Sequence, residues 1–325
     1  MSLQKRRLPI FPSMVLMLGS LAQLCLLGSA SAQVADEGWV FISNLEGLGS
    51  DATGDGTRAK PFQTAERALQ AGPKVRFLPN APNTPYPAFT LGGDTTTEYV
   101  LMADAGPRAT RLVQFVSPGN RHFTLIGFFI SNPTGPGIDL LALGNDALIK
   151  NCIVAYCGGI GVQGSYAVML NCTVYANAAT GVSLGRLFVK NCIISRNGGF
   201  GVSGTSGSPR VAHYSYIKDN VSTDTINATV QNPLTSGLAF VNAEECDFRL
   251  ARPDPLTPGL FHQADPGIKS PDGTRSDPGA FGGPDCAAWF VRAPGVRPVI
   301  GSIVTDKSDG GAGTLKVKVR VRLAQ

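Results

Sequence analysis

Hydrophobic residues in the middle of the chain come in runs of three or four, separated by glycine, asparagine or serine. Three such runs follow one another closely, at Val162–Gly164, Ala167–Leu170 and Cys172–Tyr175. Short apolar runs bounded by turn-forming residues are typical of β-strands. No segment in this part of the chain has the ten or more residues of helical period that a helical repeat requires. The pattern therefore predicts a coil built from three short strands.

The pattern also repeats at a constant spacing. The repeated pairs are Asn151-Cys152, Asn171-Cys172 and Asn191-Cys192, together with Gly161-Val162, Gly181-Val182 and Gly201-Val202. Slightly longer shifts extend the same register back to Gly137-Ile138 and forward to Asn220. In stacked coils of this kind, each coil buries its inward side chains against its neighbours. We therefore expect an all-β, single-stranded right-handed parallel β-helix with about 20–24 residues per coil.

Stacking gives the repeated polar residues a structural role. Asn151, Asn171 and Asn191 should lie at one corner of successive coils, about 4.8 Å apart. At that spacing each side-chain amide can donate to the carbonyl oxygen of its neighbour, which satisfies polar groups that the corner would bury. The adjoining cysteines should form an inward stack of small hydrophobic side chains. These are Cys152, Cys172 and Cys192.

Residues 1–32 have the pattern of a cleaved export signal. Residues 5–7 are basic, Ser13–Gly28 is an apolar run, and Ala30-Ser31-Ala32 is a small-x-small cleavage site. A run of about 16 apolar residues is shorter than the roughly 20 that span a membrane. We therefore expect a mature chain that begins at Gln33 and is secreted, periplasmic or attached to the cell surface, without a transmembrane span.

Composition narrows the class of protein. Charged residues make up 16% of the chain, and there are 39 glycines and 23 prolines. A coiled coil or helical bundle needs more charge and less glycine, whereas a disordered chain would lack the 43% of hydrophobic residues. The formal net charge is +5, and three of the positive charges belong to the signal. The nearly neutral mature chain gives little support to binding of nucleic acid.

Two motifs flank the repeats. Residues 55–64 (DGTRAKPFQT) lead into Ala65–Ala71, a short helix that Thr64 can cap and Gly72 can end. Residues 272–283 (DGTRSDPGAFGG) follow the repeats and are preceded by DFRL at 247–250. With these motifs, the chain resembles bacterial right-handed β-helix proteins of the pectin-lyase-like superfamily. Its second motif is similar to the closing motif of the choice-of-anchor Q group.

The resemblance covers about residues 36–284 and implies the fold, but it does not select an activity. The superfamily contains lyases, hydrolases, epimerases and proteins without known chemistry. Both motifs are interpreted as caps, because the open ends of a solenoid must be covered. At the C-terminal cap we expect Arg275 and Asp277 to form a hydrogen-bonded pair. Cys246 and Cys286 are candidates for a disulfide across that cap.

The likeness stops near residue 283. We expect a β-helix domain with its caps over residues 33–286 and a β-strand tail over 287–325. The tail ends in Leu315–Leu323, where apolar residues alternate strictly with four cations. One interpretation is a terminal strand laid on the β-helix, with its edge protected by lysine and arginine. The other is a basic stripe that docks on acidic polysaccharide or on the outer membrane surface.

The resemblance also implies where a ligand would bind. In polysaccharide-active relatives substrate lies along the first sheet, to which the Gly-Val strands should belong. The residue after each valine should point outward, which gives a row of Asp139, Gln163, Ser183 and Ser203. The adjoining turn carries Tyr156, Ala176, Arg196 and Asp219. Asp139, Arg196 and Asp219 are therefore the catalytic candidates. The ligand-binding candidates are Asp139, Gln163, Ser183, Ser203 and Tyr156.

This row has one carboxylate and no base. The lyase chemistry of such relatives needs carboxylates that hold calcium and a lysine or arginine that takes a proton, and hydrolases need two acidic residues around the bond. No Cys/His cluster has metal-ligand spacing. We therefore expect no metal or cofactor, with calcium entering only if the lyase alternative holds.

Three functions follow as hypotheses. The preferred one is a non-catalytic exported scaffold that binds carbohydrate or a protein partner. The first alternative is a polysaccharide lyase or glycoside hydrolase that acts on acidic polysaccharide. The second is an envelope-attached, adhesin-like structural protein.

Overall fold

The computed structural model describes residues 38–81, 84–141, 146–204, 210–251, 259–288, 298–306 and 316–323. Within these ranges the helical elements are the α-helix α2 (Ala65–Ala71) and the 3-10 helix η1 (Pro284–Ala288), and the other elements are β-strands. None of the described helices is long and apolar enough to cross a bilayer. The export signal expected at residues 1–32 lies outside the described residues.

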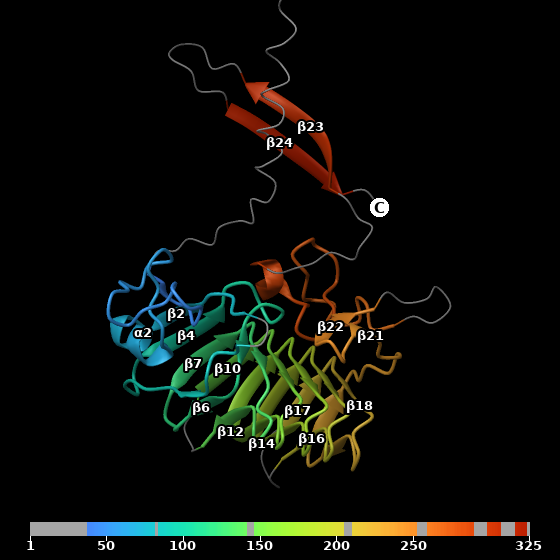
Figure 1. Ribbon diagram of the computed structural model, residues 1–325. Coiled ribbons are helices and arrows are strands. Elements are labelled where there is room, and N and C mark those ends of the chain that lie inside the picture. The colour runs from blue at the N-terminus through green and yellow to red at the C-terminus, as the bar shows by residue number, and fades with distance from the viewer. Residues whose placement is uncertain are drawn as a thin grey trace, which may run out of the picture. The chain divides into compact units, whose positions relative to one another are not determined.

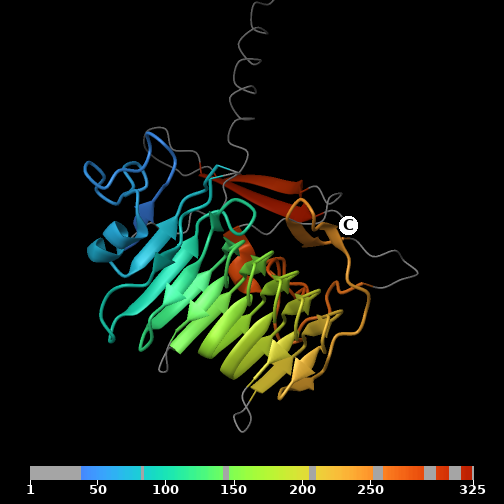
Figure 2. The same ribbon diagram turned by 60° about the horizontal axis from the view of Figure 1, so that its bottom comes forward.

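Parallel strands stack into two sheets that form the walls of a solenoid (Figures 1 and 2). Sheet A has 14 strands, which are β1 (Val40–Ile42), β2 (Lys74–Phe77), β3 (Phe89–Thr90), β4 (Glu98–Ala103), β6 (Phe115–Ser117), β7 (His122–Ile126), β9 (Ile138–Leu140), β10 (Asp146–Lys150), β12 (Val162–Leu170), β14 (Val182–Lys190), β16 (Val202–Ser203), β17 (Arg210–His213), β19 (Thr225–Ile226) and β20 (Thr229–Gln231). Sheet B has six, which are β5 (Arg111–Leu112), β8 (Phe129–Ile130), β11 (Ile153–Ala155), β13 (Thr173–Tyr175), β15 (Ile193–Ser195) and β18 (Tyr216–Lys218).

The register of the strands reproduces the sequence repeat. Val162 pairs with Val182, and Ile138 pairs with Val162, as the repeated glycine-aliphatic pairs require. Each coil thus lies on the next at the predicted spacing, and the prediction of an all-β parallel β-helix is confirmed. The prediction of three separate strands per coil is wrong for two coils. There the first two runs join into one long strand, as in β12, where the backbone turns at Gly164 with φ 138°.

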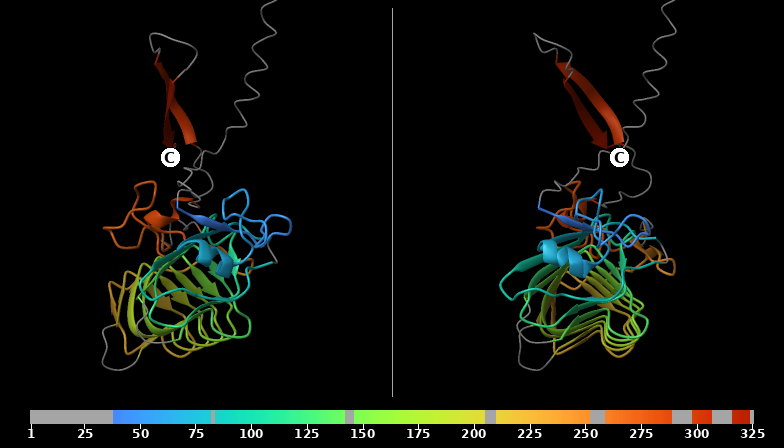
Figure 3. Two further views of the ribbon diagram at one scale, coloured as in Figure 1. Left: turned by 90° about the vertical axis from the view of Figure 1, so that its left-hand side faces the viewer. Right: turned by 60° about the vertical axis from the view of Figure 1, so that its left-hand side comes forward.

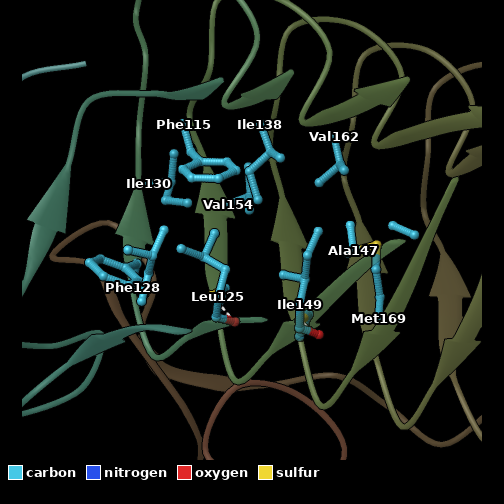
Figure 4. Close-up of a cluster of buried hydrophobic side chains, with 14 of the residues drawn as sticks. Phe115, Leu125, Phe128, Ile130, Ile138, Ala147, Ile149, Val154, Val162 and Met169 are labelled. Carbon is cyan, nitrogen blue, oxygen red and sulfur yellow. Dashed lines mark hydrogen bonds between the residues drawn. The ribbon is translucent and has the colours of Figure 1, made fainter. Parts of the chain in front are cut away.

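The core lies between the inward faces of the two sheets. Leucine, isoleucine, valine and phenylalanine from successive coils fill it, as Figure 4 shows for Phe115, Leu125, Ile138 and Ile149. Cys152, Cys172 and Cys192 also belong to this cluster and are fully buried. The alternation of inward apolar and outward residues along each strand therefore becomes one continuous hydrophobic column.

The N-terminal end of the column is closed by α2, which lies in front of the nested coils in Figure 3. As predicted, Thr64 caps the helix, because its Oγ1 accepts a hydrogen bond from the Arg67 backbone N–H. Ala65 and Ala68 are buried against the main core. Asp51 ties the entry loop to the cap by accepting hydrogen bonds from the backbone N–H and the hydroxyl of Thr64.

After β20 the chain turns back over sheet B. The antiparallel pair β21 (Phe240–Asn242) and β22 (Asp247–Leu250) places Phe248 in an aromatic cluster with Phe129 and Tyr175. Phe129 and Tyr175 project outward from sheet B, so this face of the solenoid is covered by the chain's own C-terminal part. A third cluster, formed by Ile193, Tyr216, Leu234 and Leu260, extends this cover.

Residues 259–286, here called the strap, do not form the expected cap over the C-terminal end. The strap follows the corner between sheets A and B, with Gly279 N–H donating to the Asn191 carbonyl and Ala280 N–H donating to Thr173 Oγ1. Farther along, Asp285 pairs with Lys150 at 3.1 Å. Later strap residues meet earlier coils, so the strap runs back along the solenoid toward its N-terminal end.

The tail forms a separate antiparallel pair, β23 (Pro298–Asp306) with β24 (Lys316–Leu323). β24 matches the strand predicted over Leu315–Leu323. Among the described strands its hydrogen-bonded partner is β23.

Candidate functional site

The residues of the predicted outward row, on β9, β12, β14 and β16 of sheet A, do lie next to one another on neighbouring strands. Gln163 pairs in register with Asp139 on one side and with Ser183 on the other, and Ser183 pairs with Ser203. All four side chains are half-buried. The row continues into Val116 at one end and Ile226 at the other. It therefore offers hydroxyl and amide groups and a single carboxylate.

The turn after sheet B does not bring the remaining candidates to this row. Tyr156, Arg196 and Asp219 all have positive φ, between 56° and 62°, because each is the corner residue of its coil. Tyr156 is held by the C-terminal cover: its hydroxyl donates to the Ala243 carbonyl and its ring packs against Phe248. Burial, with smaller effects from its neighbours, raises the pKa of Tyr156 to about 12. It is therefore a packed structural residue and not an open ligand contact.

Arg196 and Asp219 each have a local partner on sheet B. The Arg196 guanidinium lies 5.8 Å from the centroid of the Tyr175 ring, and Asp219 accepts a hydrogen bond of 2.9 Å from the Tyr216 hydroxyl. Burial and this hydrogen bond raise the pKa of Tyr216. No hydrogen bond or ion pair found among the described residues links either side chain to Asp139. The three catalytic candidates therefore do not form one site.

The corner asparagines do not bond to one another as expected. Asn151 Nδ2 donates to the carbonyls of Ala280 and Gly282, and Asn171 Nδ2 donates to that of Asp277. Asn191 Oδ1 accepts from the Asp265 N–H. All three have φ between 50° and 55°. In this corner conformation their amides face the strap, so they do not bond to the asparagines of the neighbouring coils.

The ladder of amides is formed by a different set of asparagines. Asn177 Nδ2 donates to Asn197 Oδ1, and Asn197 Nδ2 donates to Asn220 Oδ1, each at 2.9 Å. Asn177 and Asn197 are fully buried in the turn after sheet B. The same oxygens also accept backbone N–H groups, so the ladder satisfies polar groups that this turn would otherwise bury unpaired.

The C-terminal motif is held by two separate contacts and not by the predicted Arg275–Asp277 pair. Arg275 donates to the carbonyls of Ala264 and Gln263, and Asp277 accepts from the His262 N–H at 2.6 Å. Burial raises the pKa of Asp277. Both side chains thus make hydrogen bonds within the strap, between residues 262–264 and residues 275–277. Cys246 and Cys286, the proposed disulfide partners, are both free thiols.

Sheet A carries a second outward row, here called the charged row, that was not predicted from the sequence. It lies on β4, β7 and β10 and on the second half of β12 and β14, and consists of Glu98, His122, Asp146, Tyr166 and Arg186. Glu98 pairs in register with His122, and His122 with Asp146, so the three lie on neighbouring strands. Tyr166 and Arg186 pair on the next two strands, at the position that continues this row. His122 Nδ1 lies 3.5 Å from Asp146 Oδ2. This row could have been predicted if the repeat register had been extended to the start of the second apolar run of each coil.

An apolar row lies beside it. It consists of five apolar residues and one threonine, all half-buried: Val100, Thr124, Leu148, Val168, Phe188 and Val211. On β4, β7, β10, β12 and β14 each member lies two residues after the member of the charged row, with one buried residue between them. Together the two rows present carboxylate, imidazole, phenol and guanidinium groups next to apolar surface. Neighbouring strands are about 4.8 Å apart, so the groups recur at a spacing suited to an extended ligand.

The charged row lacks the features of an enclosed catalytic centre. Glu98, His122, Asp146 and Arg186 are exposed, whereas catalytic groups act most strongly where water is excluded. Within the described part of the chain, no three histidine, cysteine or acidic side chains lie close enough to hold a metal ion.

Comparison with known proteins agrees with this architecture. Residues 116–248 match the family model described as "Right handed beta helix region". The solenoid is a right-handed β-helix. The match starts in β6 and ends in β22, so it includes all of β7–β21 and ends before the strap. No curated protein and no solved structure matches the chain.

Proposed function

We propose that the protein is an exported, non-catalytic β-helix scaffold that binds an extended carbohydrate along the outer face of sheet A. One observation carries this proposal. Sheet B is covered by the C-terminal segments, whereas sheet A presents the row from Glu98 to Arg186 beside half-buried apolar side chains. Sugars combine hydroxyl groups with apolar ring faces, so a surface that pairs polar groups with apolar ones fits this class of ligand.

We also propose that the protein is exported and that it is related to the choice-of-anchor Q group. The basic start, apolar run and small-residue cleavage site of residues 1–32 support secretion. The DGTRSDPGAFGG motif supports a relationship with the choice-of-anchor Q group within the pectin-lyase-like superfamily. Sequencing the N-terminus of the mature protein tests the export proposal, with Gln33 as the expected first residue.

The binding proposal is tested with a glycan panel and the purified mature chain, with and without calcium. We expect binding without turnover. Binding should weaken at least about tenfold when a cross-strand pair of the row is removed in Tyr166→Ala with Arg186→Ala, because each such contact contributes about 1 kcal/mol or more. The matched control is Glu244→Ala, an exposed residue between β21 and β22, away from sheet A.

Two results would contradict the proposal. Unsaturated uronate products, detected by ultraviolet absorbance, or new reducing ends would establish a lyase or a hydrolase. Retention of full affinity in the double variant would show that the charged row on sheet A is not the binding face.

A further inference from the structure

The last coil of the solenoid has a free edge. β19 pairs with β16 and β20 pairs with β17, and no other described strand lies on their far side. In Figure 2 these are the yellow and orange strands at the end of the stack. The opposite end of the solenoid is closed by α2. The strap does not supply an equivalent cap, because it runs along the side.

The free edge has the surface of an interface. Ile226 in β19 is 38% exposed, and Val221, in the turn before β19, is 75% exposed. Ala228 and Val230 are partly buried and pack against the main core. Residues 225–231 contain no charged side chain and no proline. Natural edge strands are usually protected by charge, proline or a covering segment. This edge has neither of the first two, so it calls for a covering segment.

The tail hairpin has complementary properties. A two-stranded ribbon is marginally stable by itself and needs another surface. β23 is rich in β-branched residues and carries a single charge, at Asp306, which is the composition of a strand paired on both sides. β24 carries Lys316, Lys318, Arg320 and Arg322, the composition of a protected outer strand.

The chain between them is long enough. The strap is fixed to Lys150 through Asp285. Register pairing leads from Lys150 through three further strands to Gln231 in four steps, about 19 Å at about 4.8 Å per strand. The nine residues 289–297 can span roughly 30 Å when extended. The hairpin can therefore reach the last coil without release of the strap.

We propose that the β23–β24 hairpin closes the C-terminal end of the solenoid. β23 pairs with the free edge formed by β19 and β20, and β24 becomes the new, positively charged outer strand. The hairpin would thereby do at this end what α2 does at the other. This assignment accounts for the alternating basic tail, which the carbohydrate-binding proposal leaves unexplained, and it does not depend on that proposal.

Amide hydrogen exchange in the full mature chain tests the assignment. A proline at the centre of β23, in Ile303→Pro, removes an N–H and prevents regular pairing of that strand. We expect the amides of residues 225–231 to exchange at least about tenfold faster in this variant, since exchange reports local opening. The matched control Ile303→Val keeps the N–H and should leave exchange unchanged. Peptides from α2 and β10 serve as internal references.

Three results would overturn the assignment. If residues 225–231 exchange equally fast with and without the proline, nothing in the tail covers them. If they are equally protected in both proteins, another segment covers the edge. If their protection rises with protein concentration, the occupant is a second copy of the chain.

Discussion

At the scale of single residues, the asparagines of each coil do two different jobs. Asn151 and Asn171 use their side chains to hold the strap, whereas Asn177 and Asn197 bond to each other across coils. The corner position explains the first group, because positive φ is tolerated by asparagine better than by most residues. Burial explains the second, because a buried turn must satisfy its own N–H groups.

Substitution of Asn197, the middle residue of the ladder, should therefore destabilise the protein more than the loss of its few side-chain atoms alone would. Asn197→Ala leaves the Asn177 backbone N–H without its acceptor in a fully buried turn. It also removes one of the two acceptors of Asn177 Nδ2, which keeps its hydrogen bond to the Val154 carbonyl. Each such unsatisfied group costs about 1–3 kcal/mol. We expect the free energy of unfolding, measured with urea, to fall by about 2–5 kcal/mol. Gln163→Ala, on the half-buried outer row, should stay within about 0.5 kcal/mol, and equal losses in the two variants would contradict the role of the ladder.

At the scale of elements, the strap shows why its position could not be predicted correctly. The sequence favours a cap at the DGTRSDPGAFGG motif, because both solenoid ends need cover. Its contacts with the coils are largely made by backbone groups, such as the Gly279 N–H and the Asp277 carbonyl. Contacts made by backbone groups do not depend on the type of side chain, so they cannot be predicted from the residue types. The Lys190–Asp265 and Lys150–Asp285 pairs join residues far apart in sequence, so their pairing could not be predicted from one chain.

A pair of glycines separates backbone strain from packing in the strap. Gly279 and Gly273 both have positive φ, 89° and 82°. A Cβ at Gly279 would lie 2.8 Å from Ile193 Cδ1 and 2.9 Å from Thr173 Oγ1, whereas a Cβ at Gly273 would meet nothing within 4 Å. Gly273→Ala should thus cost only the strain, about 1 kcal/mol.

Gly279→Ala should in addition loosen the strap from the coils. We expect limited proteolysis to cut the strap, residues 259–286, faster in this variant than in Gly273→Ala, with a further loss of stability of about 1–3 kcal/mol. Identical proteolysis of the two variants would mean that the strap is not held at Gly279.

At the scale of the whole molecule, the fold was predictable and the candidate binding face only in part. A regular register with inward valines and cysteines dictates stacked parallel coils, because only stacking buries those side chains together. The outward row at Asp139 and Gln163 follows from the same register. Prediction of the charged row at His122 and Asp146 would have required the register to be extended to the second strand of each coil as well. Cover of sheet B by Phe248 and its neighbours is a tertiary contact that no local pattern reveals.

None of the cysteines in the described part of the chain forms a disulfide, which matters for a chain proposed to be exported. The described cysteines are Cys152, Cys157, Cys172, Cys192, Cys246 and Cys286, all free. Burial raises the pKa of Cys152 and Cys286 to about 12 and that of Cys157 to about 11. Because the thiolate is the reactive form, these groups should resist oxidation and alkylation at about pH 8, and reaction should accelerate as pH rises toward those values.

Alkylation followed by mass spectrometry tests this expectation. The folded mature protein at about pH 8 should be labelled first at Cys246, the one cysteine of this set that is only half-buried. Cys286 should react at the rate at which the strap is released, and the four cysteines of the coils at the rate at which the solenoid opens. After denaturation without reductant, all six should carry the label. Four labels would mean that two cysteines are paired, and recovery of the other two only after reduction would identify Cys246–Cys286 or another pair as a disulfide of the exported protein.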